Sequence, residues 1–301
     1  MSSSQETGRG VLFVFGAFLI WGLFPLYWKP LHDVPALQIL CHRIAWSALF
    51  VAALLLVRRQ WGWLAEFVRS PGKLGIFALS SALLSTNWLI YIWAVNADRV
   101  LDASLGYFIN PLINVLLGRL FLGERLAPVQ KAAVGLAALG VLWLTILAGT
   151  PPWVALGLGL SFGCYGLLRK QAPLASLPGL ALETFLMLPL ALGALLWFDL
   201  QGQGAFGHID GLHDALLAGA GVVTAIPLLL FAAGARRLKL ATVGVIQYTS
   251  PIMQLLLGAW LFHEPFGSGR LVGFGFIWAG LALYSGAGLL DYLRTRSVRP
   301  A

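Results

Sequence analysis

Residues 104–125 read SLGYFINPLINVLLGRLFLGER, and an altered form of this stretch, TVGVIQYTSPIMQLLLGAWLFHEP, occupies residues 242–265. In both copies a proline is followed by six residues, a glycine, five residues and a glutamate, and the two frames lie 140 residues apart. A weaker match at an offset of 138 extends the similarity upstream, between 94–106 and 232–244. The frame and the upstream match together predict an internal duplication, with one repeat in 1–148 and the other in 149–301.

The composition is that of an integral membrane protein. Of the 301 residues, 59% are hydrophobic and 11% are charged, whereas about 25% of the residues of a soluble domain are charged. The chain holds 12 tryptophans, a residue that anchors helices at membrane interfaces. The net charge is +8, but the basic residues lie between apolar segments, so we expect no nucleic-acid partner.

Ten segments are long and apolar enough for a membrane-spanning helix, which needs about 20 residues. We therefore predict an all-α integral membrane protein with ten transmembrane helices in two inverted five-helix repeats. The expected spans are 10–28, 36–57, 74–97, 103–122, 128–148, 152–168, 179–198, 212–234, 241–262 and 270–290.

The distribution of lysine and arginine predicts the orientation. With a cytoplasmic N-terminus, 16 of the 20 basic residues fall on the cytoplasmic side, three fall outside, and Arg43 lies within a helix. This asymmetry predicts that both termini are cytoplasmic. Because five is an odd number, the second repeat would cross the membrane in the opposite direction from the first. Inverted repeats of this kind are typical of secondary transporters, which alternate between two states.

Several motifs of catalysis are absent from the sequence. It has no G-x-x-x-x-G-K-[ST], no H-E-x-x-H and no G-x-S-x-G, which argues against nucleotide hydrolysis and against the common hydrolase mechanisms. Cys41 and Cys164 lie in apolar runs, so we expect no disulfide, metal or cofactor. We predict a protein that is not an enzyme. Two other classes stay open: an intramembrane enzyme that acts on lipid, and a receptor or assembly partner that transports nothing.

Arg43 and Glu183 are the charged residues that lie away from the ends of the expected spans, and they correspond at the offset of 140. A charge at the bilayer centre costs about 2.5–3.5 kcal/mol on insertion scales, so it usually has a function. We predict that Arg43 binds substrate and that Glu183, with His42 as a second titratable group, couples transport to protons. The alternative is a structural charge that is paired with a neighbour or reaches toward the interface.

Polar and aromatic side chains within the spans predict a central cavity for an amphipathic or aromatic organic solute. Pro111 and Pro251 each remove a helical hydrogen bond and free the carbonyl four residues earlier, so we expect helix breaks that act in gating. Glu124 and Glu264 end their helices, and we expect them to be structural. Besides Arg43, the predicted cavity residues are Trp46, Asn87, Tyr91, Tyr107, Asn110, Tyr165, Gln247 and Tyr248.

The chain resembles the drug/metabolite transporter superfamily of the EamA type, and more closely the RarD-like permeases. The resemblance implies a basket-like fold in which helices 1–4 and 6–9 enclose the cavity and helices 5 and 10 are peripheral. It also implies a multi-pass protein of the bacterial inner membrane that moves small organic solutes, usually outward, as a monomer or homodimer. The segments that carry it are 21–29 (WGLFPLYWK), 42–47 (HRIAWS), 87–88 (NW), 103–111 (ASLGYFINP), 161–170 (SFGCYGLLRK), 183–184 (ET), 224–228 (TAIPL) and 247–248 (QY).

Overall fold

The regular structure is helical throughout the part of the chain that the computed structural model describes, which is residues 3–59, 61–64, 70–121, 123, 127–171, 174, 176–235, 237–238, 243 and 246–297. Helices satisfy every backbone hydrogen bond within one segment, which hydrocarbon surroundings require. In chain order they are α1 (Ser3–Gly22), α2 (Phe24–Trp28), η1 (Lys29–Leu31), α3 (Ala36–Arg58), α5 (Pro71–Asn96), α6 (Val100–Phe121), α7 (Pro128–Ala148), α8 (Trp153–Gln171), α9 (Ser176–Leu200), α10 (Gly211–Ala235), α12 (Thr249–Leu256), η2 (Leu257–Leu261) and α13 (Ser268–Ser297).

Six of the described helices are long and apolar enough to cross a membrane, and a bent pair at the N-terminus would make a seventh. The six lie in α3, α5, α6, α7, α9 and α10. The apolar part of α8, Trp153–Leu168, is shorter. All ten expected ranges overlap helical segments, but length and composition establish six or seven spans within the described residues, so the count of ten stays a prediction.

The first expected span, 10–28, is bent rather than straight. Thr7–Gly22 and Phe24–Leu31 meet at an angle of 42°, because Pro25 in the first turn of α2 has no N–H and its ring would clash with the carbonyl of Trp21 in a continuous helix. The Trp21 carbonyl instead accepts a hydrogen bond of 3.2 Å from Nε2 of Gln254 on α12. A side chain from the far end of the sequence therefore satisfies the carbonyl that the bend exposes.

The two prolines of the repeated frame sit in different local structures. Pro111 lies inside α6, which continues through it from Val100 to Phe121 without interruption. Pro251 lies in the first turn of α12, a position that tolerates proline, and the two residues before this helix, Gln247 and Tyr248, form a turn. The expected interruption is thus present ahead of Pro251, whereas at Pro111 the helix persists.

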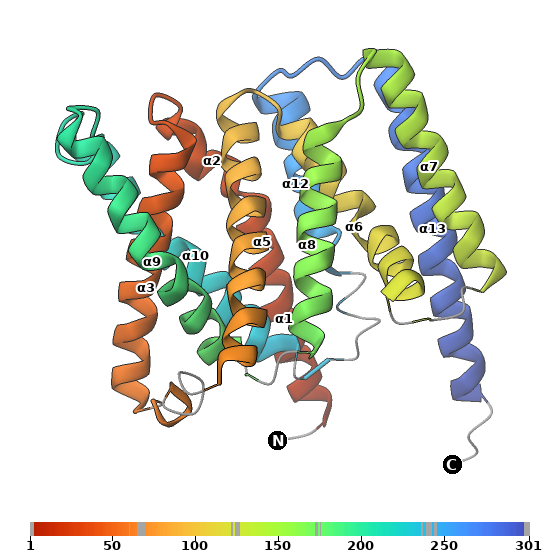
Figure 1. The fold of residues 1–301 in the computed structure, drawn as a ribbon. Helices are drawn as coiled ribbons and strands as arrows, with labels where there is room; N and C mark the ends of the chain where they lie inside the picture. Colours follow the sequence, from red (N-terminus) through yellow and green to blue (C-terminus); the bar gives the residue numbers. More distant parts are fainter. Residues whose placement is uncertain are drawn as a thin grey trace.

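The two halves of the sequence interleave in one bundle. Helix α1 packs on α10 and α12, α5 packs on α8 and α9, and α3 contacts both α9 and α10, while α6 contacts α8 and α12. Figure 1 shows that the start of α1 and the end of α13 lie on the same side of the bundle. Each half therefore completes its core with helices of the other, and the division at 148 stays a prediction about the repeat.

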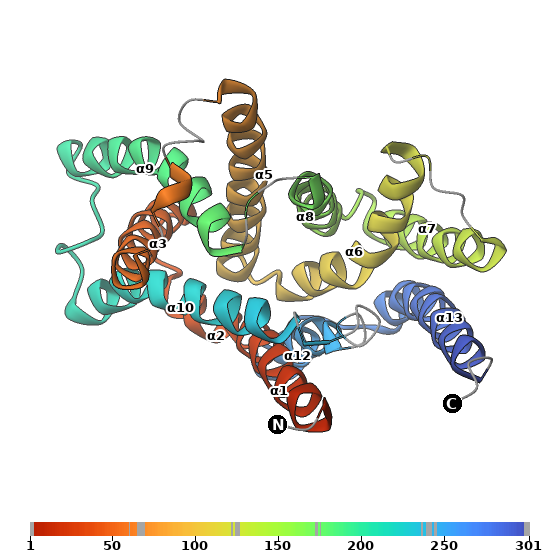
Figure 2. The ribbon, with the colours of Figure 1, turned by 90° about the horizontal axis from the view of Figure 1, so that it is seen from below.

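Helices α7 and α13 form a pair at one edge of the bundle (Figures 1 and 2), with α6 as their neighbour. Glycine allows their backbones to approach closely. A Cβ added at Gly140 would lie 2.7 Å from the carbonyl oxygen of Gly273, and one at Gly280 would lie 2.7 Å from that of Ala133. Small residues of this kind drive helix packing in membranes. These are the fifth and tenth expected helices, and their edge position agrees with the resemblance.

Glu264 caps the N-terminus of α6. Its buried carboxylate accepts hydrogen bonds from the backbone N–H groups of Val100, at 2.6 Å, and Leu101, at 2.9 Å. A carboxylate is favoured at a helix N-terminus because the first N–H groups have no helical partner. Burial raises the pKa of Glu264, and the two backbone bonds oppose that rise. This geometry agrees with the expected structural role, while Glu124 lies outside the described residues.

Candidate functional site

Arg43 lies in the interior of the bundle, on α3, with only 3% of its surface exposed. Its Nε donates a hydrogen bond of 2.9 Å to Oγ1 of Thr224 on α10. A buried charge usually has an ionic partner. Arg43 has no carboxylate within ion-pair distance among the residues that the structure describes.

Aromatic rings surround the guanidinium in place of an acid. The guanidinium carbon lies 4.0 Å from the ring centre of Trp88, 5.2 Å from that of Trp28 and 5.7 Å from that of Phe24. The faces of such rings attract a cation, and the attraction is stronger where water is excluded. We name these residues, with the tyrosines in electrostatic range of the guanidinium, the Arg43 cluster: Phe24, Tyr27, Trp28, Arg43, Trp88, Tyr91, Tyr107 and Thr224.

Two hydrogen-bond donors of the Arg43 cluster are unused. The hydroxyl of Tyr91 and Nε1 of Trp28 are buried and have no hydrogen-bond partner among the described residues. Most buried polar groups in proteins do have a partner, so an unsatisfied donor calls for an explanation. Tyr91 also packs against Tyr107, with ring centres 5.8 Å apart. The cluster therefore holds a cation and spare donors in an aromatic setting.

Glu183 occupies a second buried site, on α9, with 2% of its surface exposed. Ser80 on α5 donates a hydrogen bond of 2.7 Å to its carboxylate, and the hydroxyl of Tyr165 on α8 donates one of 3.3 Å. Three helices meet at this carboxylate: α5 from the first half of the sequence, and α8 and α9 from the second. The three polar groups therefore form the second site around one carboxylate.

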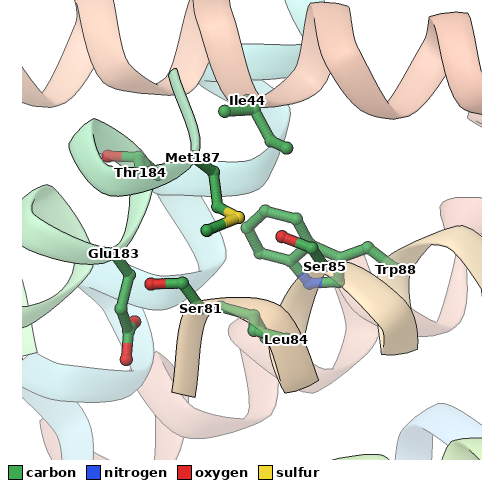
Figure 3. A pocket seen from close by; sticks show the side chains of 8 residues that line it. All are labelled: Ile44, Ser81, Leu84, Ser85, Trp88, Glu183, Thr184 and Met187. Atoms are coloured by element: carbon green, nitrogen blue, oxygen red, sulfur yellow. The ribbon is translucent and has the colours of Figure 1, made fainter. Parts of the chain in front are cut away.

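A pocket lies beside Glu183, between α3, α5 and α9 (Figure 3). About 190 Å³ of space there is not filled by atoms, and this volume includes space open to solvent. In Figure 3 the Trp88 ring and Met187 lie toward one end and Glu183 toward the other, with Ser81 between them. Trp88 belongs to both the pocket and the Arg43 cluster, so it connects the two sites. The lining residues are Ile44, Ser81, Leu84, Ser85, Trp88, Glu183, Thr184 and Met187.

The two buried charges lie in opposite halves of the bundle. Arg43 and Glu183 each follow the first residue of their helix by seven positions, about 10 Å at 1.5 Å per residue. Because α3 and α9 run in opposite directions (Figure 1), these depths are measured from opposite sides. Arg43 bonds a hydroxyl on α10 and Glu183 bonds one on α5. The structure shows two related sites, and Arg43 makes no ion pair with Glu183.

The side chains of three predicted cavity and coupling residues contact groups other than Arg43 and Glu183. His42 and Trp46 pack against Phe206, in the segment between α9 and α10, with ring centres 5.3 Å and 6.0 Å apart. Asn87 donates to the carbonyl of Leu158 and the hydroxyl of Ser161, both at 3.0 Å. Its amide nitrogen therefore fixes α5 to α8.

The remaining predicted residues lie nearer the other edge of the bundle. The amide oxygen of Asn110 is buried without a hydrogen-bond partner among the described residues. Tyr248 packs against the core formed by α6, α7 and α13, and Gln247 lies beside it in the turn before α12. Of the predicted cavity residues, Tyr91 and Tyr107 lie near Arg43, and Tyr165 lies near Glu183.

Sequence reasoning missed five residues that contact the charges: Phe24, Trp28, Trp88, Thr224 and Ser80. Trp28 follows a proline near the end of an apolar run, which is also the pattern of an interfacial anchor. A single threonine or serine in an apolar helix carries little signal, since it can bond its own backbone. The signal that could have found Thr224 and Ser80 is a hydroxyl side chain inside a neighbouring apolar helix, where it can bond a buried charge.

A bundle of apolar helices with buried charges of both signs is the architecture of a membrane transport protein. The model of the EamA-like transporter family matches residues 8–146 and 151–286. The chain belongs to the EamA-like transporter family and is a multi-span membrane transporter of the drug/metabolite type, in the inner membrane. Its substrate class is thereby a small solute.

Named relatives and a solved structure agree with this assignment. Protein RarD of Streptomyces exfoliatus is 44% identical over 99% of this chain and 94% of its own length. The uncharacterized transporter YojE of Bacillus subtilis is 50% identical over 93% and 94%, and protein RarD of Escherichia coli is 42% identical over 93% and 95%. A crystal structure with 18% identity covers 91% of this chain and 96% of its own, with a TM-score of 0.60, and shares the fold.

Proposed function

We propose that the chain is a secondary transporter that moves a small organic solute by alternating access, without ATP. The proposal includes ten spans in two inverted repeats, in which α1, α3, α5, α6 and α7 correspond to α8, α9, α10, α12 and α13. Helix contacts support this correspondence. The contact of α1 with α10 corresponds to the contact of α8 with α5. In the same way, the α6–α8 contact corresponds to the α12–α1 contact, and the α3–α10 contact corresponds to the α9–α5 contact.

Three further contacts join a helix to its own counterpart: α3 with α9, α6 with α12 and α7 with α13. This is the pattern expected when a twofold axis in the membrane plane passes between the members of each pair. Two packings of nearly equal stability can then exist, one open to each side. In any one state, one of the two related interfaces must therefore be more tightly packed than the other.

The observation that carries the proposal is that these two interfaces do differ. At the contact of α3 with α10, a Cβ added at Gly221 would lie 2.4 Å from the backbone carbonyl of Trp46, so the backbones touch. At the related contact of α5 with α9 lies the pocket beside Glu183. One interface is in backbone contact, and the related interface contains a pocket. With cytoplasmic termini, as proposed, the side of the bundle that holds Glu183 would face the cytoplasm (Figure 1).

The residues take distinct roles in this mechanism. Arg43, with Tyr91 and Tyr107, would hold the solute near the centre of the bundle. Glu183 would bind and release the coupling proton, because it is a buried acid beside the open pocket. The turn ahead of Pro251 would act as the hinge of α12, since proline has no N–H to continue the hydrogen bonding of the preceding turn. We propose outward transport.

Flux in proteoliposomes tests the proposal. Solutes that raise the unfolding temperature of the purified protein would be loaded, and their exchange and their accumulation under a pH gradient would be measured separately. We expect Glu183→Gln to retain solute exchange and lose gradient-driven accumulation. Asp199→Asn, at the far end of the same helix, is the matched control and should retain both. Accumulation and pH dependence that survive in Glu183→Gln would refute coupling, and an absence of any solute flux would refute transport.

A further inference from the structure

We infer that the transported solute carries a carboxylate on a flat, apolar body, and that Arg43 binds this carboxylate. This inference rests on the proposed function and names the chemical class of its solute. The charge, the hydrogen bonds and the rings around Arg43 each support a part of it.

The charge of Arg43 is uncompensated where it lies. The side chain is 97% buried, since 3% of its surface is exposed, and no described carboxylate is within ion-pair distance. The other buried charge inside the bundle, Glu183, accepts hydrogen bonds from Ser80 and Tyr165 and makes no ion pair with Arg43. A buried cation without an anion is unfavourable. An anionic solute would supply the missing charge, whereas a cationic one would add to the imbalance.

The unused hydrogen-bonding groups around Arg43 can all donate. A guanidinium has five N–H groups, and the one bond that Arg43 makes with described residues, from Nε to Thr224, uses one of them. The Tyr91 hydroxyl and Nε1 of Trp28 are also unused. A carboxylate accepts at both oxygens and pairs with the two-pronged arrangement of a guanidinium. The free N–H and O–H groups thus match a carboxylate in charge and in bonding.

The rings around Arg43 specify the rest of the solute. Trp28, Trp88 and Phe24 present apolar faces around the guanidinium. Trp88 also lines the pocket with Ile44 and Met187 (Figure 3), so a solute in that pocket contacts the ring that covers Arg43. An aromatic body stacks favourably on such rings. The Trp88 ring therefore lies between the pocket and the guanidinium of Arg43 as a contact shared by both.

Matched probes test the inference on the full-length protein in detergent. The probes are 3-phenylpropionate, its neutral amide 3-phenylpropanamide, and 3-phenylpropylamine, and binding is measured by titration calorimetry. We expect the carboxylate to bind at least about tenfold more tightly than the amide, and the amine to bind most weakly. Arg43→Gln should abolish the difference between carboxylate and amide, and Arg43→Lys should retain part of it.

Two further variants keep the test decisive. Arg99→Gln removes an arginine that lies between Trp93 and Trp153 and pairs with Asp102 near the surface, and it should leave the preference unchanged. Tyr91→Phe removes only the unused hydroxyl and should weaken carboxylate binding while amide binding stays the same. This second variant decides the question if Arg43→Gln does not fold. The inference is wrong if the wild type binds no carboxylate or does not prefer it to the amide, or if the preference survives in Arg43→Gln.

Flux of the same probes separates this inference from the proposed function. Carboxylate binding that depends on Arg43 but gives no flux in proteoliposomes would uphold the anion site and refute transport through it. Flux of the amide and the amine equal to that of the carboxylate would uphold transport and overturn the anion site.

Discussion

Gly221→Ala should force α3 and α10 apart. The added Cβ would lie 2.4 Å from the carbonyl carbon and oxygen of Trp46 and 2.8 Å from the backbone nitrogen of Ser47. Ordinary contact begins at 3.4 Å, so the two backbones must separate by about 1 Å. These neighbours are backbone atoms of a helix, which cannot rotate away as a side chain can.

The cost of this separation can be estimated from the structure. Overpacking of a close contact costs about 1–3 kcal/mol, and alanine recovers about 0.5–1 kcal/mol of helix propensity. We expect a net loss of about 1–2 kcal/mol. Thr224 and Arg43 lie three residues from Gly221 and Trp46, on the same interface, so their 2.9 Å hydrogen bond would lengthen to about 4 Å and be lost. The variant should therefore lose both stability and the positioning of Arg43.

Thermal unfolding in detergent, with binding of 3-phenylpropionate as the functional assay, measures both effects. The control is Gly193→Ala in α9, where an added Cβ meets no atom within 4 Å, and which should be neutral or slightly stabilising. We expect Gly221→Ala to unfold about 2–3 °C below the wild type and to bind the probe less tightly. Equal unfolding temperatures for the two variants would show that α3 and α10 are not in backbone contact.

Three further predictions concern other contacts. Glu264→Ala should lower the free energy of unfolding by about 2 kcal/mol, because two N–H groups of α6 lose their acceptor. Because burial raises the pKa of Glu264, the stability of the wild type should fall as the pH rises from the ordinary glutamate pKa to the raised one. Glu264→Gln should flatten that slope in unfolding titrations. Gly140→Ala should separate α7 from α13 and lower the unfolding temperature, whereas Gly135→Ala, where an added Cβ meets open space, should not. Asn87→Leu should cost about 2 kcal/mol in denaturant unfolding, since two interhelical bonds are lost, and an unchanged midpoint would contradict that linkage.

The sequence determined the membrane class, the helical structure and the positions of most helices. These properties depend on apolar length and on where chain breaks occur, which are local. Arg43 and Glu183 were found in the same way, because a charge inside an apolar run is conspicuous whatever surrounds it. The repeated frame located Glu264 and predicted a structural role for it, but its bonds to the N–H groups of Val100 and Leu101 at the start of α6 are long-range contacts.

The tertiary structure alone decided which side chains meet. In a membrane both the lipid-facing and the buried faces of a helix are apolar, so periodicity does not reveal which face turns inward. For that reason the sequence could predict a coupling role for His42 and a cavity role for Trp46 and Asn87 without showing their neighbours. The structure packs His42 and Trp46 on Phe206, and the amide nitrogen of Asn87 joins α5 to α8. Thr224 reaches Arg43 across 181 positions of sequence, because the helices of the two halves interleave. The rotation of each helix and the choice of its neighbours are set by packing, and packing is a property of the whole bundle.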